Sequence, residues 1–350
     1  MKSFFCSLVK KIPGVAMALA VAAVAKLLEM LEEHAGLHFI GASVIALFIG
    51  MLINAFFKPN AVTSPGIRFT SKKILKFAII LLGASLNIRT VLTVGKFSLV
   101  VMLFTLATCF GLGALIGKWM GLNWRTSSLI NAGTGICGGS AIAAIAPVID
   151  ATDTDIAYGM SATFLFDTVM VVVFPLIGRA LGLSDAAFGL WAGTAVNDTS
   201  SVVATGYAFS EAAGDFATMV KLTRTLAIIP AVLVFAAINL HLKRKAAEGG
   251  DATVKVSIRS IFPWFILAFL VMSGLTSLGL IPAAVAAVLK NISKFLMVAA
   301  LAAIGLNTDF RSLCRSGARP MIHGFIVSLL VVLVAIGVEY MIGIAPSGTL

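Results

Sequence analysis

Residues 131–147 read NAGTGICGGSAIAAIAP, an apolar stretch interrupted by four glycines and several small polar residues. Glycine in a helix interior costs about 1 kcal/mol relative to alanine, so the stretch predicts a broken helix. Within a membrane, unwound backbone is tolerated only where protein buries it or a water-filled cavity borders it. The free N–H groups and positive dipole at a half-helix N-terminus would attract an anion there. Close helix packing through Gly135 and Gly139 is the alternative interpretation.

The composition around this stretch is that of a polytopic membrane protein. Of the 350 residues, 59% are apolar and 12% are charged, against roughly 25% charged in a soluble domain. Apolar stretches of about 20 residues, long enough to cross a bilayer as helices, recur from end to end. We therefore predict an all-α fold in which residues 1–350 form a single membrane domain with about eleven transmembrane helices. The predicted spans are 12–31, 37–57, 74–94, 97–118, 126–149, 156–179, 187–209, 216–240, 261–280, 284–308 and 320–344.

Basic residues between the spans set the predicted orientation. The positive-inside rule puts the N-terminus in the cytoplasm and the C-terminus in the periplasm of a bacterial inner membrane. Arg125 and Arg179 then fall on the cytoplasmic side and Asp153 on the periplasmic side. The polar segment 241–260 is predicted as a cytoplasmic connector, so a reporter fused near Ala246 should lie in the cytoplasm. Because the net charge of +11 is dispersed among the loops, it does not indicate nucleic-acid binding.

The glycine-rich stretch has an internal echo 60 residues later. Residues 133–144 read GTGICGGSAIAA and residues 193–204 read GTAVNDTSSVVA, with Gly, Thr, Ser and Ala at matching places. A shorter echo relates residues 85–87 to residues 305–307, in spans predicted to run in opposite directions. Such echoes are typical of transporters built from inverted repeats around discontinuous helices, although chance similarity between small-residue helices is the alternative.

Polar residues within four predicted spans suggest a binding site. Lys221 and Arg224 lie three residues apart on one helix face and could converge on an anion; ion pairs with Asp167 and Asp198 are the alternative. An ionised Asp198 in mid-span costs a few kcal/mol, so we assign it, with Asp167, to ion coupling by H⁺ or Na⁺. The predicted substrate-binding residues are Asn131, Thr134, Gly135, Gly138, Ser140, Asn197, Thr199, Ser200, Lys221 and Arg224.

Other chemistries have weaker support. Gly133 to Gly138 fits the GxGxxG pattern of dinucleotide sites, but no strand or βαβ unit is predicted around it. An enzyme would need a nucleophile and a base within reach, and no histidine is predicted in mid-span beside Cys137 or Ser140. The four cysteines have neither the spacing of a zinc site nor that of a disulfide framework. No enzyme activity and no cofactor are predicted.

Several stretches together resemble the YeiH-type family of bacterial membrane proteins, whose members are often named sulfate exporters. The resemblance covers nearly the whole chain. It implies a fold related to the bile acid, arsenite and riboflavin transporter superfamily, with five-helix inverted repeats and crossing broken helices. Where many relatives have a His-Asp pair, this chain has Asn197 and Asp198, so its substrate or coupling ion can differ from theirs. The matching stretches are residues 131–147, 188–193, 220–224 and 305–310.

The leading hypothesis is a secondary transporter of a small anion, such as sulfate, sulfite, a small sulfonate or a carboxylate. No nucleotide-binding motif of the GxxxxGK[ST] type occurs, so transport would use an ion gradient. An anion channel is the nearest alternative, and a membrane-embedded enzyme is a more distant one. The expected partners are the anion and the lipid bilayer, and a homodimer is compatible with the sequence.

Overall fold

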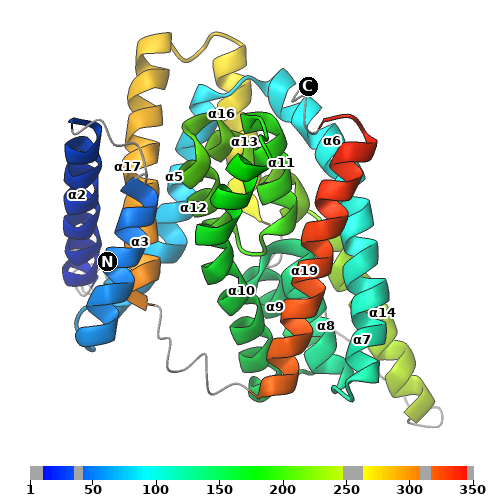
Figure 1. Cartoon of the computed structure of the whole chain (residues 1–350). Helices are drawn as coiled ribbons and strands as arrows, with labels where there is room; N and C mark the ends of the chain where they lie inside the picture. The colour runs from blue at the N-terminus through cyan, green and yellow to red at the C-terminus, as the bar shows by residue number, and fades with distance from the viewer. Residues whose placement is uncertain (1–10, 35–41, 247–262, 308–316, 345–350) are drawn as a thin grey trace. The chain divides into compact units, whose positions relative to one another are not determined.

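The computed structural model describes residues 11–34, 42–246, 263–307 and 317–344, and every regular element among them is helical (Figure 1). The all-α prediction is confirmed. The predicted connector falls partly on these residues, because 241–246 end a helix, and partly outside them. The elements are α2 Ile12–His34, α3 Ala42–Phe56, α4 Ser64–Phe69, η1 Thr70–Ile74, α5 Leu75–Leu82, η2 Gly83–Ser85, α6 Ile88–Ala107, η3 Thr108–Leu112, α7 Gly113–Trp119, α8 Trp124–Ala132, η4 Gly133–Cys137, α9 Gly139–Ile145, η5 Ala146–Val148, α10 Asp153–Ala180, α11 Asp185–Ala195, α12 Thr199–Phe209, α13 Glu211–Thr225, α14 Ile228–Ala246, α16 Trp264–Ser277, α17 Ala283–Asn307 and α19 Ala318–Met341.

Six of the described helical segments are long and apolar enough to cross a membrane. Shorter apolar helices accompany them, so the predicted count of eleven spans is not reproduced by length and composition. The long segments are Ile12–Leu31, Ile88–Trp119, Asp153–Ala180, Glu211–Leu242, Ala283–Asn307 and Ala318–Met341.

The chain divides into two compact units. Among the described residues, the first contains 11–34, 42–92, 203–211 and 264–307, and the second contains 93–202, 212–246, 263 and 317–344. Chain segments pass between the units several times, and α12 begins in the second unit and ends in the first.

The first unit packs its helices through glycines. At Gly50 on α3, an added Cβ would lie 2.4 Å from the carbonyl oxygen of Ala302 on α17 and 3.0 Å from Cα of Gly305. Gly14 on α2 and Gly66 on α4 approach each other in the same way, with 2.7 Å between an added Cβ and the facing Cα. Asn54 donates a side-chain hydrogen bond to the Leu306 carbonyl beside the first contact. Small residues let the backbones come this close, as membrane helices commonly require.

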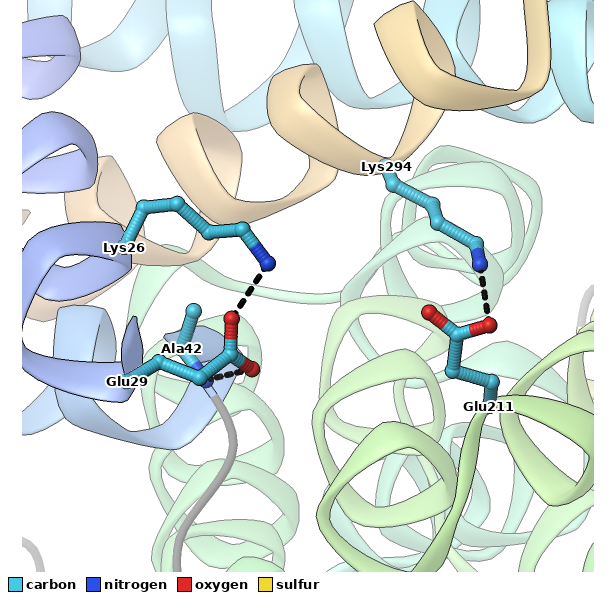
Figure 2. A network of polar contacts seen from close by, with 5 residues as sticks. All are labelled: Lys26, Glu29, Ala42, Glu211 and Lys294. Carbon is cyan, nitrogen blue, oxygen red and sulfur yellow. Dashed lines mark hydrogen bonds and ion pairs between the residues drawn. The ribbon is translucent and has the colours of Figure 1, made fainter. Parts of the chain in front are cut away.

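Charged side chains of the first unit pair near helix ends (Figure 2). Glu29 on α2 accepts a hydrogen bond of 2.8 Å from the backbone N–H of Ala42, the first residue of α3, and also pairs with Lys26. Glu211, the first residue of α13, pairs with Lys294 on α17. The Glu29 contact ties the start of α3 to α2.

In the second unit, the first broken segment packs along α10. Its 28 residues span about 42 Å, enough to cross the hydrocarbon layer. An added Cβ at Gly159 would lie 3.2 Å from Leu129 Cβ, and one at Gly133 would lie 2.7 Å from Thr163 Cγ2. The helix α8 therefore runs parallel to the first half of α10.

The first broken segment returns to the end from which it started. Arg125, at the start of α8, donates from Nε to the carbonyl of Ile149, after η5, at 2.9 Å. Thr126 on α8 donates to the Asp155 carboxylate at the start of α10. We name residues 124–149 hairpin 1: α8 and η4 lead inward to its tip, and α9 leads back. The open end of hairpin 1, where its first arm begins and its second arm ends, lies at the N-terminal end of α10. We call this open end the mouth of the hairpin.

A second hairpin enters from the opposite end of α10. Trp191 on α11 stacks on Phe174, with ring centroids 4.1 Å apart, and the Asn197 N–H donates to Asp167, two turns earlier on α10, at 2.8 Å. The helix α11 therefore runs antiparallel to α10. It also runs parallel to α13, because an added Cβ at Gly193 would lie 2.6 Å from Val220 Cγ1 and one at Gly189 would lie 3.0 Å from the Ala213 carbonyl.

Since α13 starts at the same end as α11, the intervening α12 must run back toward that end. We name residues 185–209 hairpin 2. Each hairpin turns back toward the end of α10 from which it starts, and the two start from opposite ends, whereas the sequence predicted that residues 126–149 and 187–209 each cross the membrane. With both segments turned back, Arg125 and Asp153 share one end of the unit and Arg179 lies at the other, unlike in the predicted orientation. Apolar length alone does not distinguish a hairpin of two half-length helices from one full span.

Cysteine labelling should reveal the hairpins. In a variant lacking the four native cysteines, Trp119→Cys and Thr154→Cys should react with a membrane-impermeant maleimide from the same side, and Leu181→Cys from the other. All three positions are exposed, and hairpin 1 joins the first two without crossing. Labelling is compared in intact cells and in inverted vesicles. Reaction of Trp119→Cys and Thr154→Cys from opposite sides would restore the crossing interpretation.

Candidate functional site

The tips of the two hairpins touch. Gly138, between η4 and α9, has φ 61° and ψ −132°, and an added Cβ there would lie 2.9 Å from Cβ of Asp198, between α11 and α12. The two positions are 60 residues apart, which is the offset of the sequence echo, and α9 and α12 begin at residues 139 and 199. The sequence repeat thus corresponds to two hairpins in contact at equivalent positions.

Two cations lie against the carbonyl groups that end the inward arms. Arg224 on α13 donates from Nε to the Gly135 carbonyl at 2.7 Å, from Nη2 to the Thr134 carbonyl and from Nη1 to the Val196 carbonyl at 3.4 Å. Lys221 donates to the same Val196 carbonyl at 3.0 Å. Both side chains are fully buried. The C-terminus of a helix is the negative end of its dipole, and a cation placed there is favourable. Lys221 and Arg224 are therefore suited to stabilise the C-terminal ends of the inward arms.

Two carboxylates lie at the start of the outward arm of hairpin 2. Asp167 is fully buried and accepts from the backbone N–H groups of Asn197 and Asp198, each at 2.8 Å. Asp198 accepts from the Ser200 N–H at 2.9 Å and from the Ser200 hydroxyl. Carboxylates near a helix N-terminus are stabilised by the dipole. The beginning of α12 therefore already has acidic partners from the protein.

Among the described residues, no carboxylate oxygen lies within 4.0 Å of a nitrogen of Lys221 or Arg224. The alternative that these cations form ion pairs with Asp167 and Asp198 is thus not what the structure contains. Backbone groups separate the opposite charges: the cations bind carbonyls of the inward arms, and Asp167 binds N–H groups just beyond them. The four side chains still belong to one small region, because Asn197 directly follows Val196.

Asn131 lies apart from the tips, and its side chain is already hydrogen-bonded within the protein. His323 on α19 places Nε2 3.1 Å from Oδ1 of Asn131 and 3.3 Å from the Ser127 hydroxyl. All three side chains are buried. An added Cβ at Gly113 on α7 would lie 2.6 Å from that Asn131 oxygen, so the helix packs tightly over the cluster. Asn131 therefore holds hairpin 1 against α7 and α19, and the sequence analysis had given His323 no role.

The remaining predicted residues fall into buried and accessible groups. Gly135 faces Cys109, 3.1 Å from an added Cβ, and its carbonyl is bound by Arg224. Thr134 Oγ1 and Asn197 Oδ1 are buried and have no hydrogen-bond partner among the described residues. In contrast, Ser140 is exposed, and Asp198, Thr199 and Ser200 are partly exposed. The accessible polar groups thus lie at the starts of the two outward arms.

The family of the chain follows from comparison with known sequences. Residues 13–324 match the model of a family described as conserved hypothetical protein 698. The chain belongs to this family. It is 56% identical over 311 residues to a UPF0324 membrane protein of Clostridium tetani, covering 87% of this chain and 90% of that protein. It is 44% identical over 313 residues to a UPF0324 membrane protein of Streptococcus mutans, covering 87% and 91%. The chain is accordingly a membrane protein.

Among solved structures, a sodium proton antiporter of Methanocaldococcus jannaschii aligns with 98% of this chain and 100% of that chain, at 13% identity and a TM-score of 0.29.

Proposed function

We propose that this protein is a secondary transporter of a small anion. The observation that carries the proposal is the pair of hairpins that enter from opposite ends of α10 and meet at Gly138 and Asp198. Discontinuous helices whose half-helix ends meet near the middle of the membrane are the usual binding architecture of secondary transporters. A channel needs no such paired tips, and a carrier uses them to expose one site to each side in turn.

The substrate is proposed to bind at the accessible starts of the outward arms. The hydroxyls of Ser140 and Thr199 are exposed or partly exposed there, and hydroxyls donate to oxyanions readily. The partly exposed Ser200 hydroxyl donates to Asp198, so it would bind the anion only after turning away from that carboxylate. Lys221 and Arg224 lie behind the tips, so they favour a negative ligand through their charge while their hydrogen bonds go to carbonyls. We propose sulfate, sulfite, a small sulfonate or a carboxylate as the class, following the family resemblance.

Asp198 is the proposed coupling residue. Its side chain is partly exposed at the contact between the tips, so it can exchange a proton or meet Na⁺ without unfolding a hairpin. Asp167, by contrast, is fully buried and accepts two backbone hydrogen bonds, and it is proposed to hold Asp198 in place. We further propose a bacterial inner-membrane location with the N-terminus in the cytoplasm, in keeping with the positive-inside rule.

Thermal unfolding of the purified protein tests anion binding. Sulfate, sulfite, an alkyl sulfonate and a dicarboxylate are each titrated against chloride at equal ionic strength. A ligand selective for the folded protein raises Tm with a saturable dependence on concentration. We expect one of these anions to do so, and the double substitution Thr199→Val with Ser200→Ala to abolish the shift. The matched control is Thr276→Val, which removes a carbonyl-bonded hydroxyl from α16.

Transport in liposomes then separates a carrier from a channel. The anion that binds should show saturable uptake and counterflow driven by unlabelled anion inside. If none of the four anions raises Tm above chloride, the anion assignment is rejected. If flux neither saturates nor supports counterflow, the protein is a channel.

A further inference from the structure

Arg224 is unusual among the buried side chains because it connects backbone groups of both hairpins. Its Nε and Nη2 donate to Gly135 and Thr134 of hairpin 1, and its Nη1 donates to Val196 of hairpin 2. Gly135 and Val196 are 61 residues apart in sequence and belong to segments that enter from opposite ends of α10. Arg224 itself comes from a third element, α13.

The acceptors explain why an arginine stands there. The inward arms end at carbonyls that lack helical N–H partners beyond the break, and a buried carbonyl without a donor is costly. The planar guanidinium offers donors in a fixed fork, so it can face two carbonyls of one hairpin and a third of the other. Lys221, three residues earlier on α13, adds a second donor to Val196, and this hydrogen bond reaches hairpin 2 alone.

Direct substrate contact fits Arg224 less well. Its side chain is fully buried, and three of its nitrogens already donate to carbonyls. To be bound by the same three nitrogens, an anion would have to displace the carbonyl groups of both hairpins from the guanidinium. The accessible groups lie instead on the outward arms, at Ser140 and Thr199.

We infer that Arg224 is a positioning residue that fastens the two hairpin tips to each other, so that the tips open and close together as one body. Hairpin 1 cannot withdraw from the contact at Gly138 without losing the Arg224 bonds to Thr134 and Gly135, or carrying Arg224 away from Val196. The inference rests on these contacts and not on the identity of the transported ion.

Hydrogen exchange of the ligand-free protein, followed by mass spectrometry, tests this. The reporters are the amides of Gly138 and Val196, which donate to Gly133 and Ala192 at 2.8 and 3.0 Å. In Arg224→Gln both should exchange about tenfold faster or more, because both tips lose their shared donor and local opening becomes easier. In Arg224→Lys, which keeps the charge but not the fork, the increase should be smaller at both tips.

The matched control is Arg125→Gln. Arg125 also donates to a carbonyl, that of Ile149, but within hairpin 1 and at its mouth, so tip exchange should remain as in wild type. The amide of Phe166, in the middle of α10, reports on general destabilisation. The inference is overturned if exchange accelerates at one tip only, if neither tip changes, or if Phe166 accelerates as much as the tips.

If Arg224→Gln does not accumulate as folded protein, Arg224→Lys decides, and wild-type exchange at both its tips also overturns the inference. Because no anion is present, a negative result in the Tm titrations leaves this test intact. Conversely, wild-type exchange together with lost anion-induced Tm shift would assign Arg224 to the substrate.

Discussion

Replacing Gly138 with alanine should cost about 3–5 kcal/mol of unfolding free energy and abolish anion binding, because a strained backbone and a steric overlap add together. The φ of 61° with ψ of −132° lies in a region that side chains other than glycine rarely adopt. The added methyl would lie 2.9 Å from Cβ and 3.0 Å from Oδ1 of Asp198. Neither atom can retreat while Asp198 keeps its bond to the Ser200 N–H. Denaturant unfolding in detergent and the Tm titrations measure the two effects.

Gly182→Ala is the control for the backbone contribution. Gly182 also has a positive φ, 64°, but nothing lies within 4 Å of an added Cβ. We expect it to cost about 1–2 kcal/mol and to leave anion binding unchanged. Equal losses in the two variants would mean that the contact between the hairpin tips has no energetic importance.

Asp167→Asn should destabilise the protein by about 3 kcal/mol, because a buried carboxylate that accepts two backbone hydrogen bonds is replaced by an amide with one acceptor oxygen. Asp167 binds the N–H groups of Asn197 and Asp198. After the substitution at least one of them faces an NH₂ group and loses its partner. The tip of hairpin 2 should therefore loosen, and anion affinity should fall together with stability.

Asp155→Asn provides the comparison for Asp167→Asn. Asp155 is also buried and accepts backbone and hydroxyl hydrogen bonds at the start of α10, but it lies at the mouth of hairpin 1. We expect a loss of about 1 kcal/mol, typical of a helix cap, with anion affinity unchanged. A larger loss in Asp155→Asn than in Asp167→Asn would contradict the role given to Asp167.

The sequence predicted where the helices break, but it did not predict the path of the chain after each break or the residues that surround it. Four glycines in one apolar stretch predicted the break at hairpin 1, and the 60-residue echo corresponds to the pairing of Gly138 with Asp198. Local composition was enough for this, since helix propensity is a local property. It could not show whether the chain then continues or turns back, because both outcomes use equally apolar helices.

Partner choice was the other feature that local composition could not provide. Charge alone suggested that Arg224 meets an acid or an anion, yet its partners are carbonyls 28 to 90 residues away in the chain. Asn131 was predicted at the substrate, yet His323, 192 residues away, is bonded to it. Such contacts depend on how the hairpins turn back, and they follow only once the path of the backbone is known.

The long separation between Arg224 and hairpin 1 has a consequence for synthesis of the chain. Gly135 is synthesised 89 residues before Arg224, so hairpin 1 has left the ribosome before the donor that binds its tip is made. Until α13 has been inserted, the carbonyls of Thr134, Gly135 and Val196 lack the guanidinium. Completion of the hairpin pair is therefore a late event in biogenesis, and a chain truncated between α12 and α13 would leave the Thr134 and Gly135 carbonyls without their guanidinium donor.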